Sequence, residues 1–271
     1  MPCLRTHVLL SQLDMSPYLR LIRFHYHTTF AGVALGALLT AKPSAYTMLL
    51  VLLPGLYLSF NVLLYGGIYT LNAIVDMEVD SNHPLKRHRP LPSGEIRLRS
   101  AVVFALTMIT AGLVSAWFLF NTHVFRCFVA FIALNFAYTT VAKNIAYIEI
   151  VVNAATHPLR FVMGVSLVEG RIPLTLLLAF FLLAFGAAVT RRCVERSLDG
   201  WRARRVLERY SVWSLFSMRL ASFAAIVLIA TLDESIPPII YRSVLAFYSV
   251  LVFGFELFSP LKSVLAKLWT K

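Results

Sequence analysis

Long apolar stretches alternate with shorter polar segments along almost the whole chain. A helix needs about 20 predominantly apolar residues to cross the hydrocarbon core of a bilayer. Stretches close to that length lie near residues 25–41, 46–72, 100–120, 123–142, 146–168, 173–190, 212–232 and 237–257. The pattern therefore predicts an all-α fold, in which residues 1–271 form one integral-membrane domain, a polytopic transmembrane helical bundle of about eight to nine spans.

The two ends of the chain differ from this pattern. Charged residues interrupt the apolar positions of residues 1–24, which we expect to form an N-terminal cytoplasmic or interfacial segment. Residues 258–271 are too short and too basic to cross a bilayer, so we expect an interfacial tail there. Hydrophobic residues make up 59% of the chain and charged residues 14%, and the mean hydropathy is +0.74. Such a composition excludes an ordinary soluble domain.

The formal net charge of +12 comes from basic residues that gather in particular polar segments. With the N-terminus inside, the loops 73–99, 143–145 and 191–211 and the C-terminal tail hold most of the lysine and arginine. This is the positive-inside bias of membrane proteins, so the charge requires no nucleic-acid partner. We expect a multi-pass protein of the inner or plasma membrane, with a site that faces the cytoplasm because the long charged loops lie there.

Three oxygen-bearing side chains at the end of the second apolar stretch follow helical spacing. Asn72, Asp76 and Asp80 are four residues apart, so on a helix they share one face. Mg²⁺ takes such oxygen ligands and leaves part of its shell to water and substrate phosphates. The nearby Lys86 and Arg89 can hold the outer phosphate oxygens. A solvated helix end before a basic loop would explain the cations, but not acids at the mouth of a span, where charge is costly. The stretch therefore favours a Mg²⁺–diphosphate site.

A second polar stripe follows the fifth apolar stretch. Its members recur at intervals of 4, 4 and 3 residues: Glu149, Asn153, His157 and Arg160. Ionisable side chains within a span usually face the bundle interior or a water-filled cavity. The alternative is structural pairing of Glu149 and Arg160 with neighbouring helices, since the two lie three turns apart and do not reach each other. We favour a site, and Arg191 or Arg192 at the mouth of the next span is placed to reach a phosphate there.

These motifs resemble those of a known family. The string Asn72-x₃-Asp76-x₃-Asp80, followed by the segment 89–94 (RPLPSG), resembles the first aspartate motif of the UbiA-type intramembrane prenyltransferase superfamily. Tyr138 and Lys143 resemble the lead-in to its second motif. The segments 83–90 (HPLKRHRP) and 191–195 (RRCVE), and Arg160 with Gly164, are similar to the decaprenyl-phosphate phosphoribosyltransferase branch. The resemblance runs from about residue 20 to residue 255 and implies a UbiA-like fold.

The branch implies Mg²⁺-dependent transfer of 5-phosphoribose from phosphoribosyl pyrophosphate to a polyprenyl phosphate, for cell wall biosynthesis. It implies catalysis by Asp76, Asp80 and Glu149, and metal ligation by the same three acids with Asn72. Glu149 would hold a second Mg²⁺ or the ribose hydroxyls, and Arg160 the lipid phosphate. The substrate-binding side chains implied in this way are Asn72, Tyr69, Lys86, Arg89, Tyr138, Lys143, Asn153, Arg160, Arg191 and Arg192.

Other functions remain open at this stage. In the first alternative, the same metal site ionises an allylic diphosphate, and the prenyl group passes to an aromatic or other acceptor. A transporter with an acidic cation site would also carry polar stripes inside a bundle, but here the polar groups gather at one membrane face. A catalytically silent homologue is the third alternative. It is suggested by Ala73, where the family usually has aspartate, by Glu149 in place of a second-motif aspartate, and by eight spans instead of nine.

Overall fold

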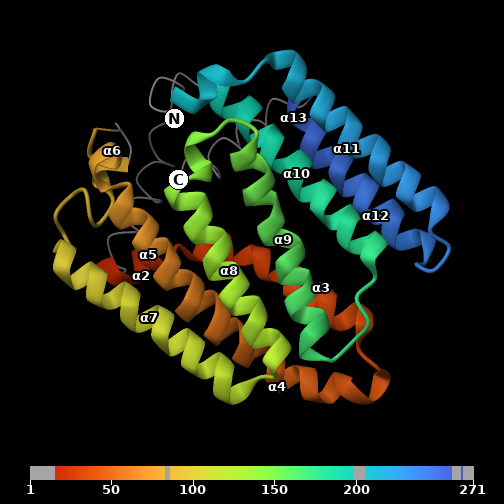
Figure 1. The fold of residues 1–271 in the computed structure, drawn as a ribbon, viewed down its shortest axis with the longest axis horizontal. Helices are drawn as coiled ribbons and strands as arrows, with labels where there is room; N and C mark the ends of the chain where they lie inside the picture. Colours follow the sequence, from red (N-terminus) through yellow and green to blue (C-terminus); the bar gives the residue numbers. More distant parts are fainter. Residues whose placement is uncertain (1–15, 83–85, 198–204, 258–263, 265–271) are drawn as a thin grey trace, which may run out of the picture.

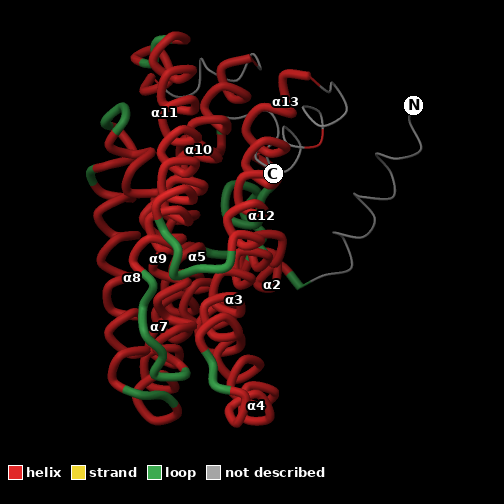
Figure 2. The backbone as a smooth tube through the Cα atoms, turned by 90° about the vertical axis from the view of Figure 1, so that its right-hand side faces the viewer, coloured by secondary structure: helices red, strands yellow, loops and turns green. Residues whose placement is uncertain are grey.

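The computed structural model describes residues 16–82, 86–197, 205–257 and 264. Most of the N-terminal segment, nearly all of the expected C-terminal tail and the start of the 83–90 motif lie outside these residues. Within the described part every regular element is a helix, which confirms the all-α prediction. Figures 1 and 2 show these helices side by side in a bundle.

The elements follow one another in chain order without a change of type. In the first half they are α2 Pro17–Ile22, η1 Phe24–Phe30, α3 Ala31–Thr40, η2 Pro43–Ala45, α4 Tyr46–Leu56, η3 Tyr57–Tyr65, α5 Gly66–Val75, α6 Met77–Ser81, η4 Lys86–His88, α7 Leu98–Leu119 and α8 Thr122–Thr140. In the second half they are η5 Ala142–Asn144, α9 Ile148–Leu167, α10 Leu174–Ser197, η7 Arg205–Arg209, α11 Val212–Leu232, α12 Pro238–Tyr248, η8 Ser249–Phe253 and α13 Gly254–Leu257.

Six of the described helical segments are long and apolar enough to cross a membrane, and they correspond to six of the eight expected stretches. They are Pro43–Val75, Leu98–Leu119, Thr122–Asn144, Ile148–Leu167, Leu174–Arg196 and Val212–Leu232. The last expected span is the shorter apolar helix Pro238–Phe253.

The first expected span, 25–41, is helical over residues 24–40, as η1 followed directly by α3, but it is not among the six long apolar helices. Its α-helical part, α3, has 10 residues, and the tighter turns of η1 precede it. Arg23 has a left-handed backbone (φ 56°, ψ 57°), which ends α2 and prevents a single helix from running through into α3. The chain therefore enters the bundle by a bend.

Helix α9 is the central element of the bundle, in contact with α3, α8 and α10. Its contact with α3 is close because glycines face backbone there. A Cβ on Gly164 would overlap the carbonyl oxygen of Val33, and a Cβ on Gly36 would overlap that of Phe161. Small residues of this kind let helix backbones approach each other within a membrane. The polar stripe of α9 is thereby fixed relative to the α3–α5 half of the bundle.

Replacing Gly164 by alanine is expected to lower the free energy of unfolding by about 1–3 kcal/mol, because the methyl group cannot fit against the backbone of α3. The matched control is Gly32→Ala on α3, where a Cβ would meet the Cβ of Arg160 at an ordinary 3.6 Å. Thermal unfolding in detergent measures both. Equal midpoints for the two variants would show that the α3–α9 contact tolerates a side chain.

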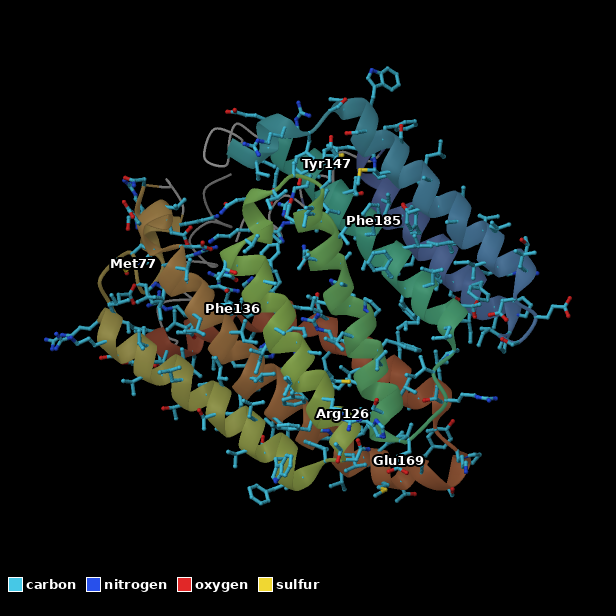
Figure 3. The ribbon with its side chains drawn as sticks, in the orientation of Figure 1. Met77, Arg126, Phe136, Tyr147, Glu169 and Phe185 are labelled. Carbon is cyan, nitrogen blue, oxygen red and sulfur yellow. The ribbon has the colours of Figure 1, made fainter. Side chains whose placement is uncertain are left out.

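The first aspartate motif and the start of α9 lie toward one end of the bundle. Figure 3 places Met77, beside the first aspartate motif, and Tyr147, at the start of α9, toward the upper end of the view. Arg126 and Glu169 lie toward the opposite end. The two polar motifs therefore lie in the same half of the molecule.

Candidate functional site

The first aspartate motif forms the end of a long helix. Asp76 joins α5 to α6 with φ −88° and ψ 0°, and the chain keeps its helical course through it. The amide of Asp76 donates to the Asn72 carbonyl at 3.0 Å, and the amide of Asp80 donates to the Asp76 carbonyl at 2.8 Å. The three side chains therefore lie one turn apart on neighbouring turns, as their spacing predicts.

Residues far away in the sequence contact this motif from α8 and η5. The Lys143 ammonium lies 3.0 Å from Oδ1 of Asp76, and the Thr139 hydroxyl donates to Oδ1 of Asn72 at 2.7 Å. These contacts join positions 67 residues apart. The structure thus brings together Lys143 and the first motif, two parts of the expected site.

Asp80 is the more enclosed of the two aspartates. It is 3% exposed, Arg89 donates to its Oδ2 at 2.6 Å, and the Lys86 ammonium lies 3.8 Å from its Oδ1. The Asp76 side chain is 50% exposed. Each carboxylate is thus held by basic side chains from another segment, and the acids and cations of the expected site lie in direct contact.

The oxygen ligands of the first motif are few enough to suit a Mg²⁺ ion that also binds a substrate. Asn72, Asp76 and Asp80 supply oxygen atoms, and Mg²⁺ typically takes only one or two carboxylates and completes its shell with water and substrate phosphates. Among the described residues, no group of three or more His, Cys, Asp or Glu side chains is arranged to hold a metal ion. The motif is therefore suited to a metal shared with a phosphorylated ligand, not to a closed protein cage.

Beside the predicted Tyr69 lie an aromatic and a basic residue, Tyr26 and Arg23, that the sequence analysis did not assign to the site. The ring of Tyr26 stacks on Tyr69 with a centroid distance of 5.1 Å, and the hydroxyls of Tyr69 and Tyr65 lie 2.5 Å apart. The Arg23 guanidinium carbon lies 5.5 Å from the centre of the Tyr69 ring. Burial, and then the positive charge of Arg89, lower the pKa of Arg23. The one sequence signal for this arginine was the presence of basic residues just before the first apolar stretch.

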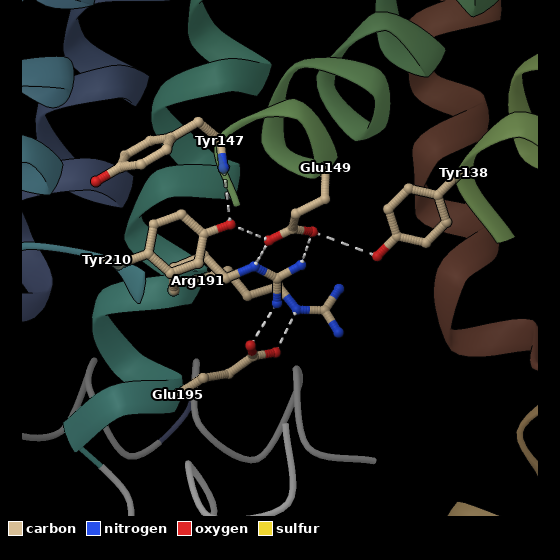
Figure 4. A network of polar contacts seen from close by, with 7 residues as sticks. Tyr138, Tyr147, Glu149, Arg191, Glu195 and Tyr210 are labelled. Carbon is tan, nitrogen blue, oxygen red and sulfur yellow. Dashed lines mark hydrogen bonds and ion pairs between the residues drawn. The ribbon is translucent and has the colours of Figure 1, made fainter. Parts of the chain in front are cut away.

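Glu149 has different partners from those expected. Its carboxylate is fully buried and receives two hydrogen bonds from Arg192. Tyr210 donates to the same carboxylate at 2.7 Å, and Tyr138 at 3.5 Å (Figure 4). Burial and the hydrogen bond to Glu149 raise the pKa of Tyr210, so the phenol stays protonated as the donor. In this geometry Glu149 is the centre of an ion-pair network, and its expected roles as a ligand of Mg²⁺ or ribose stay predictions.

The two neighbouring arginines of α10 differ in exposure. Arg192 also donates to Glu195, and its side chain is only 2% exposed. Arg191 donates to Glu195 at 2.9 Å, and its side chain is 28% exposed. Of the two predicted phosphate-binding arginines, Arg191 is thus the one whose guanidinium is open to a ligand.

Arg160 lies deeper in the bundle on α9. It is 1% exposed, donates from Nη1 to the Thr156 carbonyl at 2.9 Å, and lies 4.6 Å and 4.8 Å from the ring centres of Phe131 and Tyr65. Its Nε has no hydrogen-bond partner among the described residues. Asn153 lies one turn before Thr156 and accepts from it through its backbone carbonyl at 2.8 Å. An unpartnered buried guanidinium nitrogen is costly, and a bound ligand, ion or water molecule would satisfy it.

Comparison with known proteins identifies relatives of this arrangement. Residues 26–263 match the UbiA prenyltransferase family. The decaprenyl-phosphate phosphoribosyltransferase of Mycobacterium tuberculosis is 30% identical over 163 residues, 55% of this chain and 52% of that protein. The digeranylgeranylglyceryl phosphate synthase of Methanococcus aeolicus is 29% identical over 210 residues, 75% of this chain and 72% of that protein.

The fold also has solved neighbours. A UbiA homolog from Archaeoglobus fulgidus bound to GPP and Mg²⁺ superposes with a TM-score of 0.73 and 21% identity, over 94% of this chain and 98% of that one. The chain spans about half the length of the curated phosphoribosyltransferases that it matches. The likeness of fold therefore covers the whole bundle, while the likeness to those phosphoribosyltransferases covers part of it.

Proposed function

Because this chain belongs to the UbiA prenyltransferase family of multi-span membrane transferases, we propose that it transfers 5-phosphoribose from phosphoribosyl pyrophosphate to a polyprenyl phosphate. Relatives that carry the name decaprenyl-phosphate phosphoribosyltransferase support this choice of donor and acceptor. The excess of basic residues in the loops around the site supports a site that faces the cytoplasm, in the inner or plasma membrane.

The observation that carries the proposal is the pairing of each first-motif carboxylate with cations. Lys143 holds Asp76, while Arg89 and Lys86 hold Asp80. These cations are within reach of any phosphate that binds at the carboxylates, and charge-assisted hydrogen bonds to phosphate oxygens are strong. A site with this many cations suits a donor with more negative charge than a simple allylic diphosphate.

Asn72, Asp76 and Asp80 would hold Mg²⁺, which when bound neutralises the charge of the leaving diphosphate. The A. fulgidus homolog bound to GPP and Mg²⁺ supports a metal in this fold. Lys143, Lys86 and Arg89 would then turn from the carboxylates to the outer phosphate oxygens. Arg191, the more exposed of the α10 pair, adds a further cation at the same end of the bundle.

The acceptor side of the reaction is assigned to α9. Arg160 would hold the polyprenyl phosphate, because its Nε is buried and unpartnered among the described residues. An oxygen of this already ionised phosphate attacks the anomeric carbon of the sugar. The new carbon–oxygen bond forms as the bond to diphosphate breaks, and the diphosphate leaves with the electron pair. No general base is needed, because the attacking oxygen carries no proton.

Prenyl transfer is the second candidate. The digeranylgeranylglyceryl phosphate synthase of M. aeolicus matches more of this chain than the phosphoribosyltransferases do, and the A. fulgidus structure contains GPP. In this reaction the same carboxylates and cations would bind an allylic diphosphate, and an aromatic or other acceptor would take the prenyl group. The tyrosines near Arg160 would then lie beside the allylic chain.

A transfer assay separates these functions. Purified protein with labelled phosphoribosyl pyrophosphate and a polyprenyl phosphate is expected to place label in the lipid fraction with Mg²⁺ and not with EDTA. Restoring excess Mg²⁺ to the EDTA sample, with recovery of transfer, is the control for irreversible damage. Folded protein that transfers no phosphoribose but does transfer a prenyl group from an allylic diphosphate would contradict the first proposal and support the second. Failure with both donors would support the silent homologue.

A further inference from the structure

Arg23 is a basic side chain beside the site that the proposed mechanism does not use. It lies between α2 and η1, on a backbone in the left-handed region that residues other than glycine seldom adopt. Its carbonyl accepts from the amide of Tyr26 at 3.0 Å, which begins the turn of η1. The chain therefore changes direction at the residue whose side chain points over Tyr69.

The segment that carries Arg23 is anchored to the first motif. Arg20 forms an ion pair with Glu95, which follows the basic loop. Leu21 is 3% exposed and packs in one cluster with Ala73 of α5 and with Leu91. Because both α2 and the basic loop are fixed to α5, the Arg23 guanidinium keeps its position relative to the carboxylates.

The electrostatic surroundings of Arg23 distinguish it from the other cations. Lys143 and Arg89 each have an aspartate partner, whereas no carboxylate among the described residues forms an ion pair with Arg23. The charges of Arg89 and Asp80 both act on Arg23, which places it within electrostatic range of the site. The Arg23 guanidinium therefore presents a positive charge beside Tyr69 for an anion to neutralise.

We propose that Arg23, lying over Tyr69, binds the phosphate that remains on the transferred sugar, and thereby selects a phosphorylated sugar diphosphate over an allylic diphosphate. This inference rests on the proposed function. It adds a separate phosphate subsite to that function. The face of the Tyr69 ring supports the guanidinium plane, which leaves its edge free to donate two hydrogen bonds to phosphate.

Binding of two partial ligands tests the subsite directly. Ribose 5-phosphate carries only the sugar phosphate, and pyrophosphate with Mg²⁺ carries only the leaving group. Calorimetry on detergent-purified Arg23→Gln is expected to show about tenfold or more loss of affinity for ribose 5-phosphate, because a charged hydrogen bond is lost. Its affinity for Mg²⁺–pyrophosphate should stay within about twofold of wild type, and Arg23→Lys should retain part of the ribose 5-phosphate affinity.

The matched control is Arg97→Gln, an exposed arginine that flanks the start of α7 at the same end of the bundle. It should leave both affinities unchanged. Equal losses for the two ligands in Arg23→Gln would overturn the subsite and show a general electrostatic effect. Unchanged affinities would overturn it as well. A thermal midpoint equal to that of wild type shows that the variant is folded.

Steady-state kinetics provide a second test, which separates failure of the Arg23 subsite from failure of the proposed phosphoribosyl transfer. Arg23→Gln should raise KM for phosphoribosyl pyrophosphate and leave KM for geranyl diphosphate, if that is used, unchanged. Wild-type protein that transfers phosphoribose with no effect of Arg23→Gln would refute the subsite alone. Wild-type protein that neither binds ribose 5-phosphate nor transfers phosphoribose would refute the proposed function, and the subsite with it.

Discussion

Replacing Asp80 by asparagine is expected to lower the transfer rate about 100- to 1000-fold, whichever donor the protein uses. The change keeps the size of the side chain and removes the charge that would hold a metal on the diphosphate. It also leaves Arg89 and Lys86 without the carboxylate that positions them. Both effects act on the charge that develops as the diphosphate leaves, so we expect the loss mainly in kcat.

Glu78→Gln is the matched control for this variant. Glu78 is an exposed acid on the same short helix, two residues before Asp80, and its loss removes the same charge. It should leave the rate within about twofold of wild type, since charges in contact with bulk solvent are well screened. When the rate is titrated with Mg²⁺, Asp80→Asn should need a higher Mg²⁺ concentration for half-maximal rate than wild type, and Glu78→Gln should not. Full activity in both Asp76→Asn and Asp80→Asn would mean that the metal assignment is wrong.

The helices of the bundle could be predicted from the sequence because each depends on its own residues. An apolar stretch of sufficient length must form a helix in a membrane, since its backbone groups have no other partners there. Six expected spans accordingly agree with the structure. The bend at Arg23, just before the first expected span, was not predicted, because nothing in the local sequence requires a left-handed residue there. Contacts of α2 with α5 and the basic loop accompany the bend.

Local spacing predicted part of the candidate site in the same way. Helical intervals indicated that Asn72, Asp76 and Asp80 share a face, and the structure has them on consecutive turns. The same reasoning placed Glu149 on a polar stripe but could not name its partners. Arg192 and Tyr210 lie 43 and 61 residues later, and one sequence carries no signal for such pairings. A carboxylate that accepts two hydrogen bonds from an arginine is less available to a metal ion than a free carboxylate. The role of Glu149 therefore depended on knowing its distant partners, which the sequence does not show.

Replacing Arg192 by methionine is expected to lower the free energy of unfolding by about 3–5 kcal/mol, the usual result of removing one partner of a buried ion pair. Arg192 lies between Glu149 and Glu195 and donates to both. Methionine would fill much of the volume but leave the Glu149 carboxylate, which is 0% exposed, without its cation. Thermal unfolding in detergent should show a midpoint lower by about 10 °C, by the scale for soluble domains of this size.

Two further variants show whether the loss comes from the uncompensated charge. In Arg192→Met with Glu149→Gln, the amide still accepts from Tyr210 and no buried charge remains at position 149, so most of the stability should return. Arg191→Met is the matched neighbour: its guanidinium is more exposed, and among the described residues it forms an ion pair with Glu195 alone. Its free energy of unfolding should fall by no more than about 1 kcal/mol, while its affinity for the donor decreases.

A double variant no more stable than Arg192→Met would contradict this account, because the uncompensated charge of Glu149 would then not be the cause of the lost stability. Loss of stability in Arg191→Met with unchanged donor binding would reverse the roles of the two arginines, since the exposed guanidinium would then be the structural one.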